Sequence, residues 1–357
     1  MLKKEIIGLM SGTSLDGLDI AHVEFFSVNN KVTYKLMKTS TVAYPNNLLE
    51  QLRKINSAEI DEIQILNKKI GSFFAQQVNL FISEHGISKN NIDAIASHGQ
   101  TILHQPENGF TLQIGCGSTI AFLTGINVIN DFRSLDVIAG GQGAPLVPIG
   151  DFDLFESKAA SFLNIGGFCN ISFKKEHVIH AFDICPGNLP LNHFAGELGH
   201  DYDPNGELAQ KGKVNIDLLQ TLNSLDFYKL MGAKSLGTEW LDKNFYTKFK
   251  KDEKTENVLR TICEHISNQI IKCLNEHQLN SVYATGGGVK NNFLMNLIRD
   301  GYDGDIVIPN EETIDFKEAI VFAYLGYKYL VKETNTVSSV TGADRSLCTG
   351  VFHKPGY

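Results

Sequence analysis

The same order of expected strands and helices occurs twice in the chain, and this repetition limits the possible folds more than any other feature. In each half, two strand-like segments flank a turn of small residues, a third strand follows, and a helical pattern precedes a further strand and helix. The first half opens with strands expected at residues 5–10 and 18–26, and the second with two strands around a Gly-Gly turn at 160–173. We therefore predict an α/β protein with duplicated βββαβα halves.

The elements after each opening hairpin support this duplication. Third strands are expected over residues 31–44 and 177–184, and long helices with apolar residues at helical spacing over 57–86 and 256–277. A length of 357 residues suits two domains. We expect an N-terminal lobe of residues 1–136 plus 341–357 and a C-terminal lobe of residues 137–340.

Composition excludes several classes of partner. The formal net charge of −8 gives no basic surface for nucleic acid. The N-terminal apolar stretch at residues 6–10 is too short for a signal sequence, and no later run approaches the roughly 20 apolar residues of a membrane span. Six cysteines without CxxC spacing indicate reduced thiols. We expect a cytoplasmic protein that binds neither nucleic acid nor membrane, and the sequence leaves a homodimer open.

The turn between the first two strands has a composition suited to phosphate binding. Tight turns of Gly, Ser and Thr direct backbone N–H groups and hydroxyls at a phosphate without bulky side chains in the way. Asp16 and Asp19 would repel phosphate directly, so their expected role is to hold Mg²⁺ or its waters. The alternative is an ordinary hairpin turn with Asp19 facing solvent.

Two further glycine clusters occupy comparable places. Gly166 and Gly167 form the hairpin turn of the second half, where they would face the first turn across the phosphates of a nucleotide held between the lobes. Residues 286–288 follow a strand and precede a helix, where small residues let a flat ring approach the backbone. This cluster fits neither the Walker A nor the Rossmann pattern, and its alternative is a plain strand-to-helix turn.

Seven motifs, in order over nearly the whole chain, resemble those of one enzyme family. They are "MSGTSLDGLD" (10–19), "SHGQTILH" (97–104), "NDFRSLDVIAGGQGAPLVP" (130–148), "NIGGFCNIS" (164–172), "FDICPGN" (182–188), "TGGGVKN" (285–291) and "KEAIVFA" (317–323). Their order resembles the actin, hexokinase and heat-shock chaperone superfamily, and the closest likeness is to the anhydro-N-acetylmuramic acid kinases of bacterial cell-wall recycling. The resemblance implies a two-lobed actin-like ATPase fold with an ATP cleft between the lobes.

The resemblance also implies an activity and its residues. The family cleaves the 1,6-anhydro bond of a sugar and phosphorylates the freed O6 with Mg-ATP, giving N-acetylmuramic acid 6-phosphate. The implied nucleotide contacts are a first phosphate loop of Gly12, Thr13, Ser14, Leu15, Asp16, Gly17, Leu18 and Asp19, a second of Gly166 and Gly167, and an adenosine contact of Gly286, Gly287 and Gly288.

Asp183 matches the family's catalytic base, which deprotonates the water that attacks the anomeric carbon. The residue lies at the end of an expected strand and closely precedes Pro-Gly-Asn, where a carboxylate can project into a cleft within hydrogen-bond reach of a water. The alternative is an Asp that begins a turn, a common role for Asp before Pro and Gly.

Three residues are candidates for binding the sugar. Arg133 offers a rigid fork to the lactyl carboxylate of an anhydromuramic sugar, with a structural salt bridge to Asp131 or Asp136 as its alternative. Glu318 lies on an expected helix, where its alternative is a surface acid. His98 is a candidate hydrogen-bonding group, because its spacing of six residues from His104 does not match a zinc site.

One position departs from the family pattern and leaves other functions open. Cys185 stands where the family has Gly, and because Pro186 follows, we expect an extended backbone that tolerates the side chain. The change puts the sugar's identity in doubt, so the runner-up is a superfamily kinase for another sugar or a carboxylate. A chaperone or filament protein is disfavoured because a peptide-binding domain needs more chain, and a metal-dependent tRNA-modifying relative would need clustered histidines.

Overall fold

The computed structural model describes residues 2–29, 31–55, 58–230, 232, 234–250 and 252–356. It contains two units, Met1–Phe155 with Phe316–Tyr357, and Glu156–Asp315. These junctions differ from the expected boundaries at 136/137 and 340/341, because further segments of the chain pack with the first unit. Ser57, where the first long helix was expected to start, lies outside the described residues.

The first unit is built on a mixed sheet. Its strands are β1 (Leu2–Ser11), β2 (Leu18–Val28), β3 (Lys31–Val42), β4 (Ala94–Gln105), β5 (Phe110–Ile114), β6 (Val128–Asn130) and β12 (Val351–His353). Their order is β12-β6-β4-β1-β2-β3, and β5 pairs with β4 off this path. β1, β2 and β3 form an antiparallel meander, whereas β4 runs parallel to both β1 and β6.

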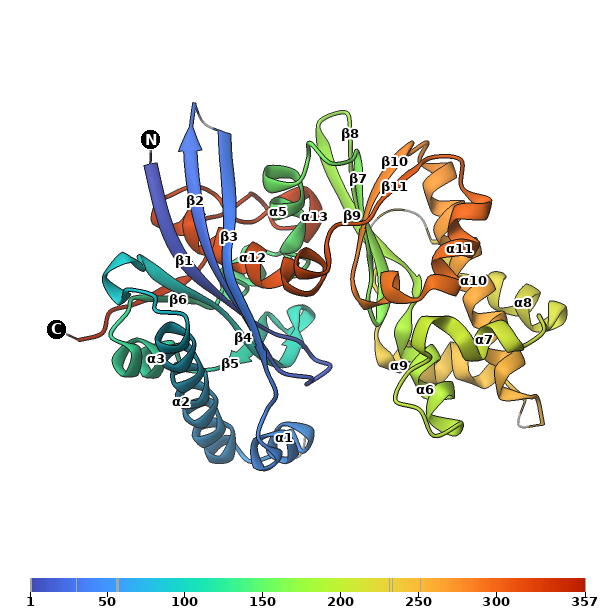
Figure 1. The fold of residues 1–357 in the computed structure, drawn as a ribbon, viewed down its shortest axis with the longest axis horizontal. Helices are drawn as coiled ribbons and strands as arrows, with labels where there is room; N and C mark the ends of the chain where they lie inside the picture. The colour runs from blue at the N-terminus through green and yellow to red at the C-terminus, as the bar shows by residue number, and fades with distance from the viewer. Residues whose placement is uncertain are drawn as a thin grey trace. The chain divides into compact units, whose positions relative to one another are not determined.

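Helices cover both faces of this sheet (Figure 1). Ile7 and Leu9 of β1 belong to the core cluster that includes α2 (Ile60–Glu84) and α3 (Gly117–Thr124). Ile6 belongs to the cluster formed with α12 (Glu311–Leu330), as the alternation of side chains along a strand requires. The last long helix therefore packs with the first half, although the chain reaches it after the second.

The helix α12 approaches β1 so closely that a side chain at the contact would not fit. A Cβ atom at Gly8 would lie 2.0 Å from the Ala319 carbonyl oxygen. The shorter helices of this unit complete its surface. They are α1 (Asn46–Arg53), α4 (Ser134–Ile138), α5 (Val147–Leu154) and α13 (Ser338–Thr341).

The second unit repeats the strand arrangement of the first. Its strands are β7 (Ser161–Ile165), β8 (Phe168–Lys175), β9 (Val178–Pro186), β10 (Ser281–Thr285) and β11 (Asp305–Val307). Their order, β11-β10-β7-β8-β9, matches β6-β4-β1-β2-β3 strand for strand, with the same parallel and antiparallel pairings. The structure thus confirms the α/β class and the duplication predicted from the sequence.

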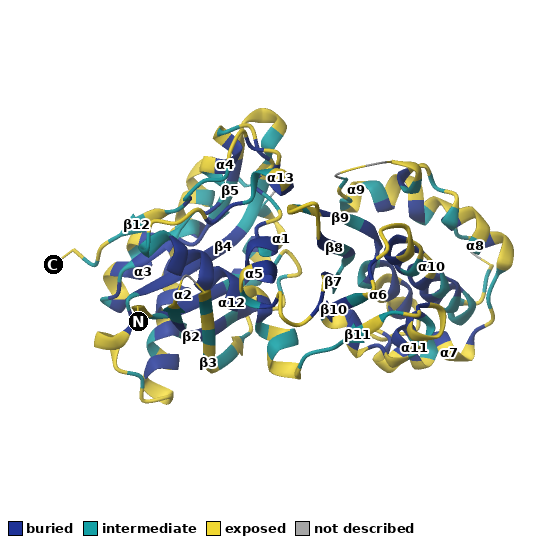
Figure 2. Ribbon diagram, turned by 90° about the horizontal axis from the view of Figure 1, so that it is seen from above, coloured by how far each residue is buried: buried dark blue, intermediate teal, exposed yellow. Residues whose placement is uncertain are grey.

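The helices of the second unit surround the long helix α10. They are α6 (Asn188–Glu197), α7 (Glu207–Lys211), α8 (Ile216–Asn223), α9 (Thr238–Trp240), α10 (Thr255–Glu276) and α11 (Asn292–Gly301). Most of α10 is buried (Figure 2), and Leu259, Ile262 and Ile266 are among the residues that it contributes to the core. Among the described residues, none of the helices has the length and apolar character needed to cross a bilayer.

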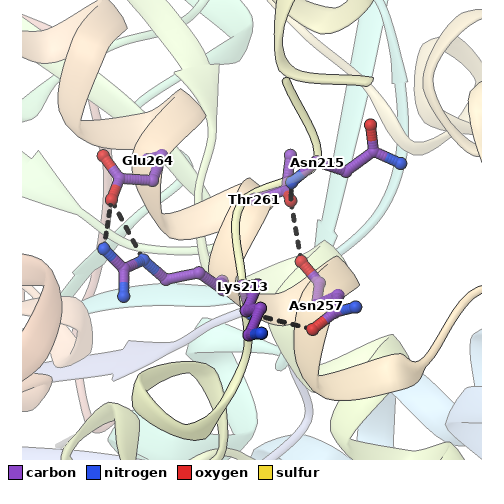
Figure 3. A network of polar contacts seen from close by, with 6 residues as sticks. Lys213, Asn215, Asn257, Thr261 and Glu264 are labelled. Carbon is purple, nitrogen blue, oxygen red and sulfur yellow. Dashed lines mark hydrogen bonds and ion pairs between the residues drawn. The ribbon is translucent and has the colours of Figure 1, made fainter. Parts of the chain in front are cut away.

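Polar groups on α10 hold the segment that leads into α8. Figure 3 shows Asn257 Oδ1 accepting from the Lys213 N–H over 2.8 Å, and Thr261 Oγ1 accepting from the Asn215 N–H over 3.0 Å. Since these bonds satisfy backbone donors outside regular secondary structure, they fix the segment to the core helix.

Candidate active site

The first glycine turn is an open loop with exposed polar side chains. It joins β1 to β2 over residues 12–17, and Thr13, Ser14 and Asp16 are exposed. The Ser14 hydroxyl donates to Asp16 Oδ1 over 2.9 Å, and Leu15 has a φ of 59° in the left-handed region. The turn therefore presents hydroxyl and carboxylate groups in addition to backbone N–H groups.

The two ends of this turn differ in how closely other atoms approach. A Cβ at Gly17 would lie 2.7 Å from the Val42 carbonyl oxygen, so β3 leaves no room for a side chain. A Cβ at Gly12 would meet only Ser14, with Oγ 3.4 Å away as its nearest neighbour. The turn is tightly packed at its β2 end and open at its β1 end.

The charged residues predicted from the sequence come together in the first unit. Thr41 Oγ1 donates to Asp19 Oδ1 over 2.6 Å, and the charge of Asp19 acts on Glu318. Desolvation raises the pKa of Glu318, which still keeps an exposed surface, and the positive charges of Lys317 and then Arg133 oppose the rise. Burial lowers the pKa of Arg133 to about 10, while Glu318 and Asp136 act in the opposite direction. Arg133, Glu318 and Asp19 thus form one electrostatic cluster.

The guanidinium of Arg133 is held by neutral acceptors. Nε and Nη2 donate to His98 Nε2 over 3.2 and 2.9 Å, and Nη1 donates to the Gly143 carbonyl oxygen over 2.7 Å. Within the described part of the chain, Arg133 forms no salt bridge with Asp131 or Asp136, the structural alternative considered above. Because these contacts use three of the five guanidinium N–H groups, two remain on Nη1 and Nη2.

The second glycine turn is closed by the loop that precedes α6. The Gly187 N–H donates to the Gly167 carbonyl over 2.8 Å, and the Asn188 N–H donates to the Gly166 carbonyl over 2.8 Å. A Cβ at Gly187 would lie 2.4 Å from the Gly166 oxygen, a distance that no side chain tolerates. The Gly-Gly and Pro-Gly-Asn motifs therefore form one packed structure.

The third glycine cluster packs against the end of β7, just before the same turn, because β10 runs parallel to β7. Gly286 has a φ of 87°, and its Cβ would lie 2.5 Å from Asn164 Oδ1. A Cβ at Gly288 would lie 2.2 Å from Ile165 Cγ2, whereas one at Gly287 would have no neighbour closer than 3.7 Å. The Gly166-Gly167 turn, the Pro-Gly-Asn motif and the cluster at residues 286–288 thus meet at the carboxyl ends of β7 and β10.

Asp183 lies near the end of β9, where a segment from outside the sheet holds it. Its backbone N–H donates to the Lys234 carbonyl over 2.9 Å, and its Oδ2 accepts from the Leu236 N–H over 2.8 Å. Burial raises the pKa of Asp183 to about 6, and the Leu236 bond opposes this rise. A carboxylate with this pKa is ionised near neutral pH and can accept a proton, as a general base must.

Cys185 is accommodated in the core of the second unit. The bulge between the Cys169–Cys185 and Asn170–Asp183 pairs leaves Ile184 without a partner in the register, which separates Asp183 from Cys185. Cys185 is fully buried in β9, and burial raises the pKa of its thiol. Its backbone is extended, as expected before a proline, and its side chain packs away from solvent.

Some groups next to the predicted residues carry little signal in the sequence. The Leu236 N–H that bonds Asp183 is a backbone group, which almost any residue supplies, so no pattern identifies it. Gln100 and Tyr44 bond the Ser11 hydroxyl at 2.5 and 2.7 Å. Gln100 belongs to the "SHGQ" motif, which could have pointed to it, whereas Tyr44 stands outside every motif.

The oxygen donors of the first turn suit a hard cation. Asp16 and Asp19 supply carboxylates there, and Mg²⁺ commonly binds through one or two carboxylates plus water and substrate phosphates. Among the residues that the structure describes, no cluster of three His, Cys, Asp or Glu side chains forms a complete protein metal site.

Comparison with known proteins gives a consistent match. Residues 4–355 match the family model described as anhydro-N-acetylmuramic acid kinase. Proteins of that name from Francisella tularensis subsp. novicida and Bacillus thuringiensis subsp. konkukian are 35% and 36% identical, and each alignment covers 97% of this chain and 98% of the relative. The relative from Shewanella loihica is 35% identical, with 98% of both chains covered.

Solved structures align over most of the chain at low identity. Component A of (R)-2-hydroxyglutaryl-CoA dehydratase from Acidaminococcus fermentans gives a TM-score of 0.47 at 12% identity, covering 92% of this chain and 99% of that one. A ROK family glucokinase from Streptomyces griseus gives 0.40 at 10% identity, covering 90% and 98%.

Proposed function

The chain belongs to the anhydro-N-acetylmuramic acid kinase family, and from this premise we propose how its residues carry out the family's reaction. The enzyme transfers the γ-phosphoryl group of ATP to O6 of anhydro-N-acetylmuramic acid while water opens the 1,6-anhydro ring. The product is N-acetylmuramic acid 6-phosphate. The observation that best supports the chemistry is the Asp183 carboxylate, which has one oxygen held by a backbone N–H and a pKa near 6.

Asp183 acts as the general base. A water attacks C1 of the sugar and loses a proton to the carboxylate, the C1–O6 bond breaks, and O6 forms a bond to the γ-phosphorus as ADP leaves. Since Leu236 occupies Oδ2 through its N–H, Oδ1 is the oxygen proposed to accept the proton. Burial supports this role because it raises the pKa of Asp183 to about 6, close to the value at which a base works well at neutral pH.

The nucleotide contacts involve all three glycine turns. Residues 12–19 and Gly166 with Gly167 form the two phosphate loops, and residues 286–288 contact the adenosine. Asp16 and Asp19 hold Mg²⁺ or its waters, and the ion supplies charge neutralisation for the phosphates when it is bound. The packed state of the second turn supports its role. The Gly166 N–H donates to the Phe168 carbonyl over 3.2 Å, and both glycine carbonyls accept from the loop before α6. The Gly167 N–H, the one proposed to face the phosphate, is therefore held by a rigid backbone that needs no reorganisation during phosphoryl transfer.

The sugar contacts come from the charged cluster of the first unit. Arg133 binds the lactyl carboxylate through the two N–H groups that its internal contacts leave over, in the paired geometry that guanidinium groups favour. Glu318 accepts from sugar hydroxyl or amide groups. Its exposed surface and its proximity to Arg133 support this role.

The family also suggests where the enzyme works. We place it in the cytoplasm, in the recycling of cell-wall sugars, as a small-molecule enzyme. A homodimer stays a prediction that gel filtration with light scattering can check.

The test of the proposed function is ADP release from ATP in the presence of candidate sugars. Anhydro-N-acetylmuramic acid should stimulate ADP release in proportion to formation of the 6-phosphate, while N-acetylmuramic acid, N-acetylglucosamine and glucose should not. Stimulation by one of those sugars alone would instead support the superfamily kinase with another substrate. Because Cys185 lies in the core, its difference from the family pattern gives no reason to expect that result.

A further inference from the structure

One buried imidazole connects the start of the first turn to Arg133. His98 lies on β4, which runs parallel to β1, and its Nδ1 is 3.1 Å from the carbonyl oxygen of Ser11, the last residue before the turn. Its Nε2 is the atom that Nε and Nη2 of Arg133 contact. Both ring nitrogens therefore have partners within the first unit.

These partners determine which nitrogen of His98 carries the proton. A carbonyl oxygen can only accept a hydrogen bond, so Nδ1 must be protonated and must donate to Ser11. A guanidinium can only donate, so Nε2 must offer its lone pair to Arg133. Burial lowers the pKa of His98 to about 3, and the positive charge of Arg133 adds to this effect. The ring is thus neutral, in a single tautomer, throughout the working pH range.

The surroundings leave the ring little freedom. His98 is 6% exposed, and its ring centroid lies 4.6 Å from that of Phe322 on α12. On one side, the Ser11 hydroxyl is buried; it donates to Gln100 Oε1 and forms a hydrogen bond with Tyr44 OH. Hydrogen bonds at both ring nitrogens and the packing against Phe322 therefore hold the imidazole in one orientation.

The fixation continues on the far side of Arg133. The Gly143 carbonyl accepts from Arg133, and the Gly143 N–H donates to Asp136 Oδ2 over 2.8 Å. Asp136 is fully buried, and its other oxygen accepts from Thr341 Oγ1 over 2.8 Å. A continuous chain of hydrogen bonds thus runs from the end of β1 through His98 and Arg133 to the loop at 140–143.

We propose that His98 is a positioning residue that orients Arg133 for the sugar carboxylate and ties that orientation to the start of the first phosphate loop. This inference rests on the proposed function of Arg133, and it replaces the direct sugar contact that the sequence suggested for His98. A neutral imidazole suits this task because it accepts from the guanidinium without neutralising it. The positive charge of Arg133 then remains available to the sugar carboxylate.

Two substitutions separate the two hydrogen bonds of His98. The amide of His98→Asn can still donate to Ser11 but is too short to reach Arg133, whereas the longer His98→Gln places an acceptor near Arg133. For His98→Asn we expect the KM for the sugar to rise roughly tenfold or more, the scale of one hydrogen bond to a charged group. The KM for ATP should change less, and His98→Gln should recover part of the loss.

A buried histidine in the other unit provides a matched control. His265 bonds Tyr228 OH at 2.7 Å and Asn223 Oδ1 at 2.6 Å, and burial lowers its pKa to about 3 as well. His265→Asn should lower Tm while leaving the KM for the sugar unchanged. A sugar KM within twofold of the unmodified enzyme in His98→Asn, or an equal rise in His265→Asn, would overturn the positioning role.

A spectroscopic readout keeps this proposal separate from the proposed function. In the enzyme labelled with ¹⁵N-histidine, the signals that disappear in His98→Asn should report a protonated Nδ1 and an unprotonated Nε2, unchanged between pH 5 and 8. A ring that titrates in this range, or the opposite tautomer, would contradict the assignment. If the unmodified enzyme released no ADP with the anhydro sugar, the proposed function would fail, and these spectra would still decide whether His98 holds Arg133.

Discussion

The two hairpin turns occupy equivalent places in the duplicated fold but are built in opposite ways. The turn at residues 12–17 exposes hydroxyl and carboxylate side chains, and a Cβ at Gly12 would meet only one nearby side chain. The turn at Gly166 and Gly167 instead bonds through its carbonyls to the loop before α6, and the end of β7 that leads into it packs against Gly286. Topological duplication therefore does not give duplicate sites, because one unit offers side-chain ligands and the other a rigid backbone.

The same difference holds for the carboxylates of the two units. Asp16 is exposed and bonds a neighbouring hydroxyl in its own turn. Asp183 is largely shielded, and a backbone N–H from a distant segment holds one oxygen. An exposed carboxylate suits a hydrated cation, whereas a shielded one with a raised pKa suits proton transfer.

The largest expected effect comes from removing the proposed base, Asp183, in the second unit. Asp183→Asn keeps the shape of the side chain and removes the basic oxygen, so kcat should fall at least roughly 10²-fold, with smaller changes in the KM values for ATP and sugar. Steady-state kinetics with both substrates measures this change.

The stability of the same variant shows whether the loss is chemical. A raised folded-state pKa means that ionisation of Asp183 above pH 6 opposes folding, so the neutral Asn should leave Tm at pH 8 unchanged or higher. A fall in Tm together with kcat would mean that the carboxylate is structural.

Some features of the fold and the site can be predicted from local sequence patterns, and others cannot. The duplicated order, the glycine turns and the position of Asp183 are readable because strand periodicity and glycine runs leave local patterns. The packing of the last helix with the first unit cannot be predicted from local patterns, since that helix follows the second half in the sequence. The hydrogen bond from the Leu236 N–H to Asp183 cannot be predicted from the sequence either, because it depends on a backbone group brought from elsewhere in the chain. Long-range packing, rather than local propensity, decides both.

Glycine substitutions test the contrast between the open first turn and the glycine cluster after β10, which packs beside the second turn. Gly286→Ala should lower the free energy of unfolding by about 1–3 kcal/mol, because it combines a positive φ with contact distances below 3 Å. Gly12→Ala in the first turn should change it by less than about 0.5 kcal/mol. Urea unfolding provides both values.

A neighbouring residue serves as the control for this comparison. Gly287→Ala should be tolerated, since its Cβ would have no neighbour closer than 3.7 Å. Equal destabilisation by the substitutions at Gly12 and Gly286 would mean that the first turn is packed as tightly as the glycine cluster after β10.

A moderate effect is expected from the exposed carboxylate of the first turn. Asp16→Asn should raise the KM for Mg-ATP roughly tenfold, the scale of one lost interaction with a charged group, without lowering Tm. Titration of Mg²⁺ at fixed ATP should show a matching increase in the concentration needed for half-maximal rate. Unchanged Mg²⁺ and ATP dependence would remove Asp16 from the nucleotide site.

The smallest effect is the pH dependence of the unmodified enzyme. Because the base must be ionised, kcat/KM for the sugar should be level above pH 7, fall to about half near pH 6 and then decline roughly tenfold per pH unit. The kcat/KM profile of Asp183→Asn should not show this fall at low pH. If the fall at low pH persisted in the variant, the titrating group would be one other than Asp183.

In the proposed reaction water attacks carbon while O6 attacks phosphorus, and isotope labelling distinguishes this route from attack of water on the phosphoryl group. The reaction is run in ¹⁸O-labelled water, quenched early and analysed by mass spectrometry, with preformed product incubated in the same water to measure exchange at C1. We expect one ¹⁸O atom at C1 of the sugar 6-phosphate, above that exchange control, and none in the phosphoryl group. Label in the phosphoryl group, or no label at C1 beyond exchange, would contradict it.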